Sequence, residues 1–109
     1  MAVYTNDLRL KEITTGDESG TWGTSTNTNL SLIGEALSFA TLACFPSDAD
    51  DTSTATVGQA TSSPARAMYF KVTSTATLSA TRTLTIAPNT ISRVMFIENA
   101  TTGSQSINI

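Results

Sequence analysis

The stretch Thr15–Leu37, TGDESGTWGTSTNTNLSLIGEAL, says more about the fold than any other part of the chain. It contains the only tryptophan, Trp22, and a run of Thr, Ser and Asn that leads into an apolar pattern. Leucines and an isoleucine then recur at spacings of three and four, which is typical of one face of a helix. The stretch predicts a sharp turn, a helix over roughly Thr26–Ala40 held by tertiary packing, and Trp22 as a packing anchor before it.

The composition indicates one small domain that is rich in β structure. The chain has 109 residues, of which 39% are hydrophobic and only 14% are charged. Ser and Thr replace many of the charged residues, and Thr is a stiff, β-branched residue that suits a pleated surface. A chain of this length has room for a single hydrophobic core.

The C-terminal half shows the period of two that is typical of strands. Met68, Phe70 and Val72 form one face of a strand, and the segment Ile91–Glu98 is apolar on both faces, as a central strand would be. The further strands that we expect lie at Leu8–Ile13, around Leu84 and Ile86, and from Ile107 onward, with a hairpin loop at Asn99–Gly103. No repeat is visible, so no solenoid is predicted. The predicted fold class is mainly β: a small antiparallel β-meander or sandwich-like domain with one short N-terminal helix.

The predicted single domain, residues 1–109, divides into three parts. Residues 1–45 form an N-terminal arm, the Gly/Trp corner and the helix. Residues 46–65 are polar and small, and we expect a long surface loop with a short paired segment around Ala55–Val57. Residues 66–109 form the β-meander, which we expect to be cut short at its last strand.

Several classes of function find no support in the residues. The net charge of −3 gives no electrostatic reason to bind nucleic acid or an anionic membrane. The absence of histidine removes the commonest general base, and the single cysteine, Cys44, is expected to be a buried apolar residue. The segment after Met1 lacks the apolar region of a signal peptide, and no stretch approaches the length of a membrane span.

Two acidic clusters are candidates for a catalytic or a metal site, and both are interpreted as solvated loops. Asp17 and Glu18 lie among glycines, and Asp48, Asp50 and Asp51 lie in the polar segment 46–65. A pair of carboxylates can serve a glycosidase and a triplet can hold Ca²⁺, but neither cluster has the supporting residues of such a site. The glycines are not spaced as a phosphate-binding loop. We therefore predict no catalytic residue, no metal, no cofactor and no enzymatic activity.

Two segments together resemble a module of structural proteins of marine tailed bacteriophages, of the cyanophage and pelagiphage type. The first is LRLKEITTGDESGTWGTSTNTNLSLIGEAL, Leu8–Leu37, and the second runs from RAMYFKVT at Arg66 to SQSINI at Ile109. The resemblance covers most of the chain and is to tail-fibre-like proteins. It implies a virion structural protein that is assembled in the host cytoplasm. Members of this family continue past the SQSINI segment with further β sequence.

The resemblance implies that the chain is the N-terminal attachment module of a tail fibre, which docks on the tail and forms a homo-oligomer, with a trimer favoured. An alternative is a head decoration or head-fibre protein, and a second alternative is a carbohydrate-binding module for a host-surface glycan, with Trp22 or Tyr69 as the stacking ring. The expected partners are further copies and other virion proteins of the tail or head, without nucleic acid or membrane. The residues expected to serve assembly and packing are Trp22, Gly20, Gly23, Asn27, Asn29, Leu30 and Ile33.

Overall fold

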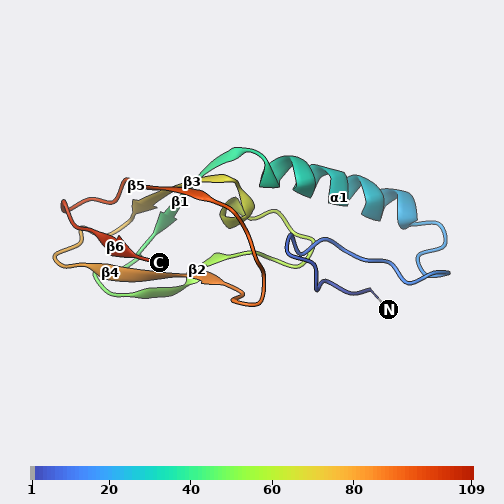
Figure 1. Ribbon diagram of the computed structural model, residues 1–109, viewed down its shortest axis with the longest axis horizontal. Helices are drawn as coiled ribbons and strands as arrows, with labels where there is room; N and C mark the ends of the chain where they lie inside the picture. The colour runs from blue at the N-terminus through green and yellow to red at the C-terminus, as the bar shows by residue number, and fades with distance from the viewer. Residues whose placement is uncertain (1) are drawn as a thin grey trace.

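The computed structural model describes residues 2–109, which form an elongated molecule of 53 × 21 × 21 Å. Figure 1 shows a helix at one end of the long axis and strands at the other. The helix, α1, spans Trp22–Ala36. The strands are β1 (Phe39–Cys44), β2 (Asp51–Thr56), β3 (Tyr69–Ser74), β4 (Arg82–Ala87), β5 (Phe96–Asn99) and β6 (Ile107–Asn108), and a short 3-10 helix, η1, spans Pro64–Arg66.

The six strands form two three-stranded parallel sheets, and the chain passes from one sheet to the other at each connection. The orders are β1-β3-β5 and β2-β4-β6, so each strand pairs with the second strand along the chain. In the first sheet Phe39 pairs with Tyr69, and Tyr69 pairs with Phe96. This is the coiling of a short solenoid, in which every turn contributes one strand to each sheet.

The prediction of an antiparallel meander is therefore wrong, and the absence of a visible repeat in the sequence gave no sign of the coiling. Alternating side chains look alike in parallel and antiparallel strands, so the period of two in the sequence does not distinguish them. The segment Asn99–Gly103 joins β5 to β6 in the other sheet, and it does not make the predicted hairpin. The connections are of unequal length, which explains why the turns leave no repeat in the sequence.

The hydrophobic core lies between the two sheets. Phe70 and Val72 of β3 are fully buried and pack with Leu84 of β4 and with Leu78 in the connection between them. The remaining members of this cluster are Cys44, Phe45, Ala55, Val57 and Ala65. The core therefore belongs almost entirely to residues 39–109.

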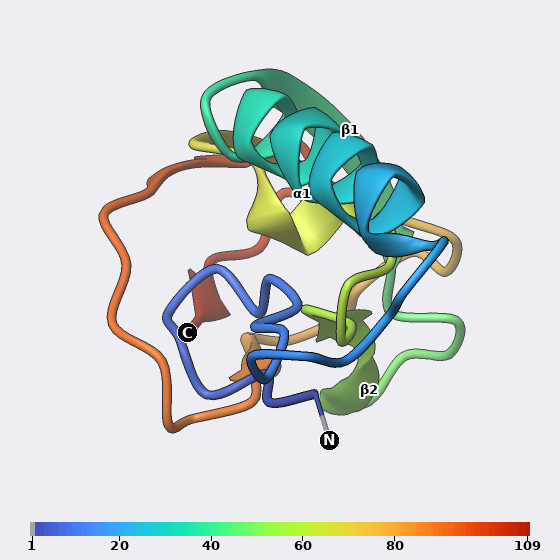
Figure 2. The same cartoon turned by 90° about the vertical axis from the view of Figure 1, so that its right-hand side faces the viewer.

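α1 lies on the outside of this arrangement and continues almost directly into β1, as Figure 2 shows along the long axis. It begins four residues earlier than predicted, after a turn in which Gly20 has a φ of 86°. Its buried side chains are Ser25, Leu32 and Ala36. The expected strand at Leu8–Ile13 is absent from the described residues, where only an isolated bridge joins Val3 to Glu12.

The polar segment 46–65 is folded rather than a bare loop. It contributes β2 and the start of η1, and β2 includes most of the short paired segment expected around Ala55–Val57. The buried Asp51 accepts hydrogen bonds from the backbone N–H groups of Phe45, Ser53 and Thr54. Carboxylate caps of this kind satisfy backbone groups at a bend.

Candidate interaction surface

The most unusual feature of α1 is that several large apolar side chains on it, and that of Leu37 directly after it, face solvent. Leu30 is 61% exposed, Leu37 is 68% exposed and Ile33 is 38% exposed. These are the residues whose spacing of three and four predicted a helix packed into the core. The helix lies four residues nearer the N-terminus than predicted at both ends, because β1 begins at Phe39. The face that it buries carries Leu32 and Ala36 and not the residues that predicted the helix.

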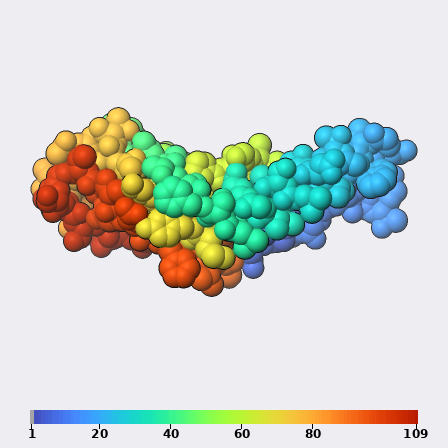
Figure 3. Space-filling view, turned by 90° about the horizontal axis from the view of Figure 1, so that it is seen from above, coloured from blue at the N-terminus to red at the C-terminus, as the bar shows by residue number. Residues whose placement is uncertain are grey.

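A row of aromatic rings crosses the outer face of the first sheet beside the end of α1. Phe39, Tyr69 and Phe96 are paired in register on β1, β3 and β5, and all three are exposed. The rings of Phe39 and Tyr69 stack with centroids 5.2 Å apart. In Figure 3 the green, yellow and orange segments, in which these strands lie, are next to the helix. Cross-strand aromatic pairs stabilise a sheet, but here they also leave a large apolar area open to solvent.

The Tyr69 hydroxyl donates a hydrogen bond to the Glu98 carboxylate, with an O–O distance of 2.6 Å. This bond raises the pKa of Tyr69, because it holds the phenol proton beside a negative charge. The bond also fixes the direction of the ring within the row.

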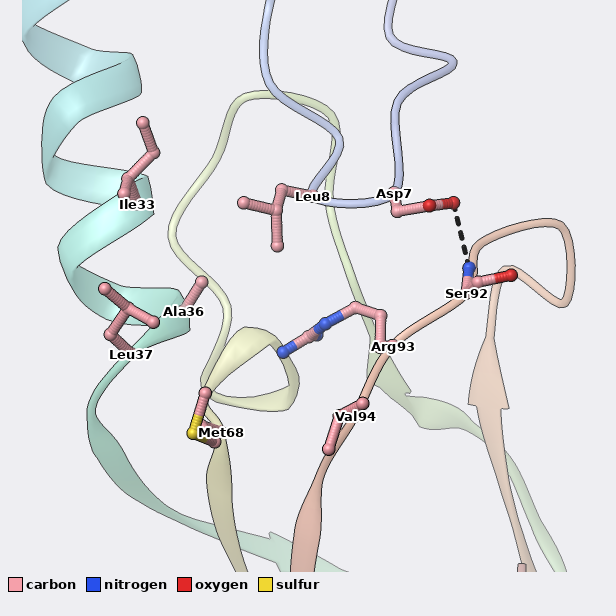
Figure 4. A pocket seen from close by; sticks show the side chains of 9 residues that line it. All are labelled: Asp7, Leu8, Ile33, Ala36, Leu37, Met68, Ser92, Arg93 and Val94. Carbon is pink, nitrogen blue, oxygen red and sulfur yellow. Dashed lines mark hydrogen bonds between the residues drawn. The ribbon is translucent and has the colours of Figure 1, made fainter.

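A groove of about 350 Å³ separates the last turns of α1 from the segment before β5. Figure 4 shows Ile33, Ala36 and Leu37 on the helix side and Val94 on the other, with Leu8 and Met68 between them. At its rim the backbone N–H of Ser92 donates to Asp7 at 2.9 Å. We call the following side chains together the apolar surface: the exposed Leu30 and Ile33 of α1 and Leu37 directly after it, the half-buried groove residues Leu8 and Met68 with the exposed Val94, and the aromatic row Phe39, Tyr69 and Phe96.

Beneath the apolar surface, a buried arginine joins the parts of the molecule. The Arg66 side chain is fully buried, and its Nη1 lies 2.8 Å from the Glu35 carboxylate of α1. Its Nε donates to the carbonyl of Leu8, and its two terminal nitrogens donate to the carbonyls of Thr61 and Gly58. The guanidinium thus ties the helix, the N-terminal arm and the segment before η1 together. Sequence reasoning missed this role, since Leu8 and Glu35 are far from Arg66 in the chain and no local pattern marks it.

Glu35 turns inward to meet this arginine. Burial of the carboxylate acts to raise its pKa, but hydrogen bonds from Ser62, from the backbone N–H of Ser63 and from Arg66 outweigh burial and lower the pKa. Glu35 is the only charged residue of α1, so the outward face of the helix carries no charge.

The remaining residues expected to serve assembly lie at the N-terminal end of α1. Trp22 is 63% exposed and is therefore not the buried anchor that the sequence predicted. Asn29 connects the helix to the arm, because its side chain accepts from the backbone N–H of Lys11 and donates to the Lys11 carbonyl. Asn27 is exposed, Gly23 lies in the first turn of the helix, and Gly20 lies in the turn that precedes it. The structure thus brings Leu30 and Ile33 into the apolar surface and leaves Trp22 at a distance along the helix.

The acidic residues have local partners. Glu18 accepts from Lys11 and from Ser25, and the lysine contact lowers the pKa of Glu18. Asp48 accepts from Arg82 and from Ser79, and these bonds lower its pKa to about 2. Within residues 2–109, no group of three or more acidic, cysteine or histidine side chains is placed to hold a metal ion.

Cys44 is fully buried, as predicted, in the core between the sheets. Burial, together with the nearby Asp51 charge, raises the pKa of its thiol to about 11. A thiol with such a pKa is protonated at neutral pH and is a poor nucleophile.

Among the described residues, the helices are too short and too polar for any of them to cross a membrane. Comparison with protein-family models, with curated proteins and with solved structures found no match. The residues themselves therefore carry the functional argument. What they offer is a largely apolar surface on one side of an elongated molecule, with a groove whose lining also includes Asp7 and Arg93, and such surfaces mark sites of protein association.

Proposed function

We propose that this chain is a non-enzymatic structural protein of a bacteriophage virion, and that it is the attachment module of a tail fibre. The observation that carries the proposal is the apolar surface on an elongated molecule, together with the resemblance of Leu8–Leu37 and Arg66–Ile109 to marine phage fibre proteins. A protein with such a surface needs a partner, since monomeric soluble proteins rarely leave contiguous apolar areas of this size in water.

Within this proposal the chain forms a homotrimer that docks on the tail. An elongated module suits a fibre, because copies that lie side by side with their long axes aligned form an assembly that is itself elongated. Light scattering on the purified chain should give the mass of an oligomer. A folded monomer at micromolar concentration would count against this part of the proposal.

The virion location is tested by comparing phage particles assembled with and without this protein. Cryo-electron microscopy should show density missing at the tail when the protein is absent. Density missing from the head would instead support the alternative of a head decoration or head-fibre protein. Particles that are identical in both preparations would overturn the virion proposal.

A glycan-binding role has one observation in its favour, which is the exposure of the Trp22 ring. Sugars stack on a free ring face, and Trp22 offers one, whereas the Tyr69 ring is stacked on Phe39. On a glycan array, wild-type protein should then bind and Trp22→Ala should not. An array without hits removes this alternative.

A further inference from the structure

We propose that a pocket around Arg9 binds a sugar acid, that is, a hydroxylated ring that carries a carboxylate. This inference goes beyond the proposed function and uses residues outside the apolar surface. The pocket has a volume of about 350 Å³ and lies between the N-terminal arm and two later segments of the chain. Its lining residues are Tyr4, Thr5, Arg9, Gln59, Thr90 and Ile91.

Arg9 differs from the other arginines because no group of the chain meets its charge. Arg66 and Arg82 bind carboxylates, and Arg93 donates to backbone carbonyls. Within residues 2–109 the Arg9 side chain has no ion pair and no hydrogen bond, and its Nε is buried without a partner. A cation that is partly withdrawn from water and unpaired is unfavourable, and an oxyanion bound beside it would offset that cost.

The backbone holds Arg9 in a fixed position. Its φ is 57°, which lies in the left-handed region that non-glycine residues rarely adopt. The Arg9 N–H donates to the Asn6 carbonyl at 2.9 Å, and the Arg9 carbonyl accepts from the Ala60 N–H at 2.8 Å. The Asn6 side chain also accepts from the Leu10 N–H. The side chain therefore starts from a rigid turn, which reduces the entropy that is lost when a ligand binds.

The terminal nitrogens of Arg9 are the atoms that a ligand can reach. Nε is covered, whereas the two Nη atoms are accessible and make no hydrogen bond with the described residues. They form a planar fork that matches the two oxygens of a carboxylate. Arg9 is the only charged residue of the lining, so a ligand with one negative charge is neutralised there. A phosphate monoester carries close to two negative charges and is matched less well.

The rest of the lining suits the hydroxylated ring of such a ligand. Tyr4, Thr5 and Thr90 carry hydroxyls, which can donate and accept hydrogen bonds. Gln59 adds an amide, and no hydrogen bond within residues 2–109 occupies any of these four side chains. A second pocket of about 280 Å³ shares Tyr4 and Gln59 with the first and continues to polar side chains of α1. The two adjoining pockets leave room for more than one sugar ring.

Isothermal titration calorimetry on the full chain tests the site with D-galacturonate as the probe. Galacturonate should bind, whereas D-galactose, which has the same ring without the carboxylate, should not bind measurably. Arg9→Gln should weaken the binding of galacturonate about tenfold or more, because charge-assisted hydrogen bonds are lost. Lys71→Gln is the matched control, since it removes the same charge from β3, outside both pockets, and should leave binding unchanged. No binding at concentrations up to about 10 mM, or unchanged binding in Arg9→Gln, would overturn the proposal.

Two further probes define the class of ligand. Inorganic phosphate should bind more weakly than galacturonate, and equally tight binding of phosphate would overturn the choice of a carboxylate. A trimer of galacturonate distinguishes an acidic polysaccharide from a free sugar acid, because only the longer ligand reaches the second pocket. Tighter binding of the trimer that is lost in Arg9→Gln supports a polysaccharide, and equal binding of trimer and monomer supports a free sugar acid.

Thermal unfolding separates a binding role of Arg9 from a structural one. Asparagine adopts the left-handed region more readily than arginine, and Arg9→Asn also removes the unpaired charge. The thermal midpoint of Arg9→Asn should therefore equal or exceed that of the wild type. A lower midpoint would show that Arg9 serves the fold and would overturn the proposal. None of these results depends on the virion location or on the oligomer, which are tested independently by the particles and by light scattering.

Discussion

The two halves of the molecule use their apolar side chains in opposite ways. In residues 39–109 the large apolar side chains meet between two sheets, with Phe70, Val72 and Leu84 fully buried. Leu30 of α1 and Leu37 directly after it face solvent, and the named contacts of the helix to the rest of the chain are mostly polar, through Glu35 and Asn29. The difference teaches that the β half has a hydrophobic core of its own, whereas the helical half makes few apolar contacts within the chain; the proposed oligomer would supply further ones.

The largest expected effect comes from the core of the β half. Phe70→Ala should lower the free energy of unfolding by about 3–5 kcal/mol, because it removes a fully buried ring and leaves a cavity. Leu32→Ala, which removes the main apolar contact of α1, should cost about 2 kcal/mol, the lower end for such a change. Urea unfolding of both variants in the Leu30→Ser/Leu37→Ser background measures the difference without a contribution from association. Equal losses would mean that the two halves share one core.

The Glu35–Arg66 ion pair, which links the two halves, should be the next most sensitive site to mutation. Glu35→Gln leaves the fully buried Arg66 without its carboxylate, and we expect a loss of about 3 kcal/mol. Glu12→Gln serves as the control, because that carboxylate is exposed and its removal should change stability much less. The same urea titration reports both changes. An unchanged midpoint for Glu35→Gln would show that the guanidinium is held by the carbonyls of Leu8, Thr61 and Gly58 alone.

Substitutions at two glycines should change the stability of the two halves in opposite directions. Gly103 has a φ of 108°, and a Cβ there would lie 2.0 Å from the Leu78 carbonyl oxygen, so Gly103→Ala should destabilise the β half by about 2 kcal/mol. Gly34 lies in α1 with open space around it, so Gly34→Ala should stabilise the helix by up to about 1 kcal/mol. Thermal unfolding followed by circular dichroism should show the first midpoint fall and the second rise. A fall for Gly34→Ala would mean that its outer side is occupied in the assembly.

The smallest expected effect is that of pH near neutrality. The chain has no histidine, so stability should be flat between about pH 5 and 8. The pKa values of Glu35, Asp48 and Asp51 are lowered in the folded protein, and that of Asp48 is about 2. A carboxyl group whose pKa is lowered by folding stabilises the folded state at pH values above its pKa in the unfolded chain. This stabilisation is lost as the pH falls from about 4 toward 2. A thermal midpoint that changes between pH 5 and 8 would contradict this assignment.

The sequence predicted some elements of the fold well, and the reasons are local. The helix was expected because Leu30, Ile33 and Leu37 have helical spacing, and β3 was expected because Phe70 and Val72 alternate with polar residues. Both features depend only on neighbours in the chain. Cys44 as a buried residue also follows from its local setting, between small residues and an aromatic one.

The arrangement of these elements could not be predicted in the same way. Parallel pairing joins residues about 30 apart, such as Phe39 with Tyr69, and no signal in a non-repeating sequence marks those partners. The helical spacing of Leu30 and Leu37 shows that one face is apolar but not whether this chain or another covers it. For the same reason the aromatic row was visible only as separate residues. Arg66 was missed because two of its partners, Leu8 and Glu35, come from distant segments of the chain.

The proposal that the helical half is stabilised by other copies is tested most directly by hydrogen–deuterium exchange at several protein concentrations. Below the concentration at which the oligomer dissociates, amides of α1 should exchange quickly while those of β3 and β4 stay protected, since each half is stabilised by different contacts. Raising the concentration should slow exchange in α1 and leave β3 unchanged. If α1 is equally protected at all concentrations, including those at which the chain is a monomer, the helix is stable without partners and the account is wrong.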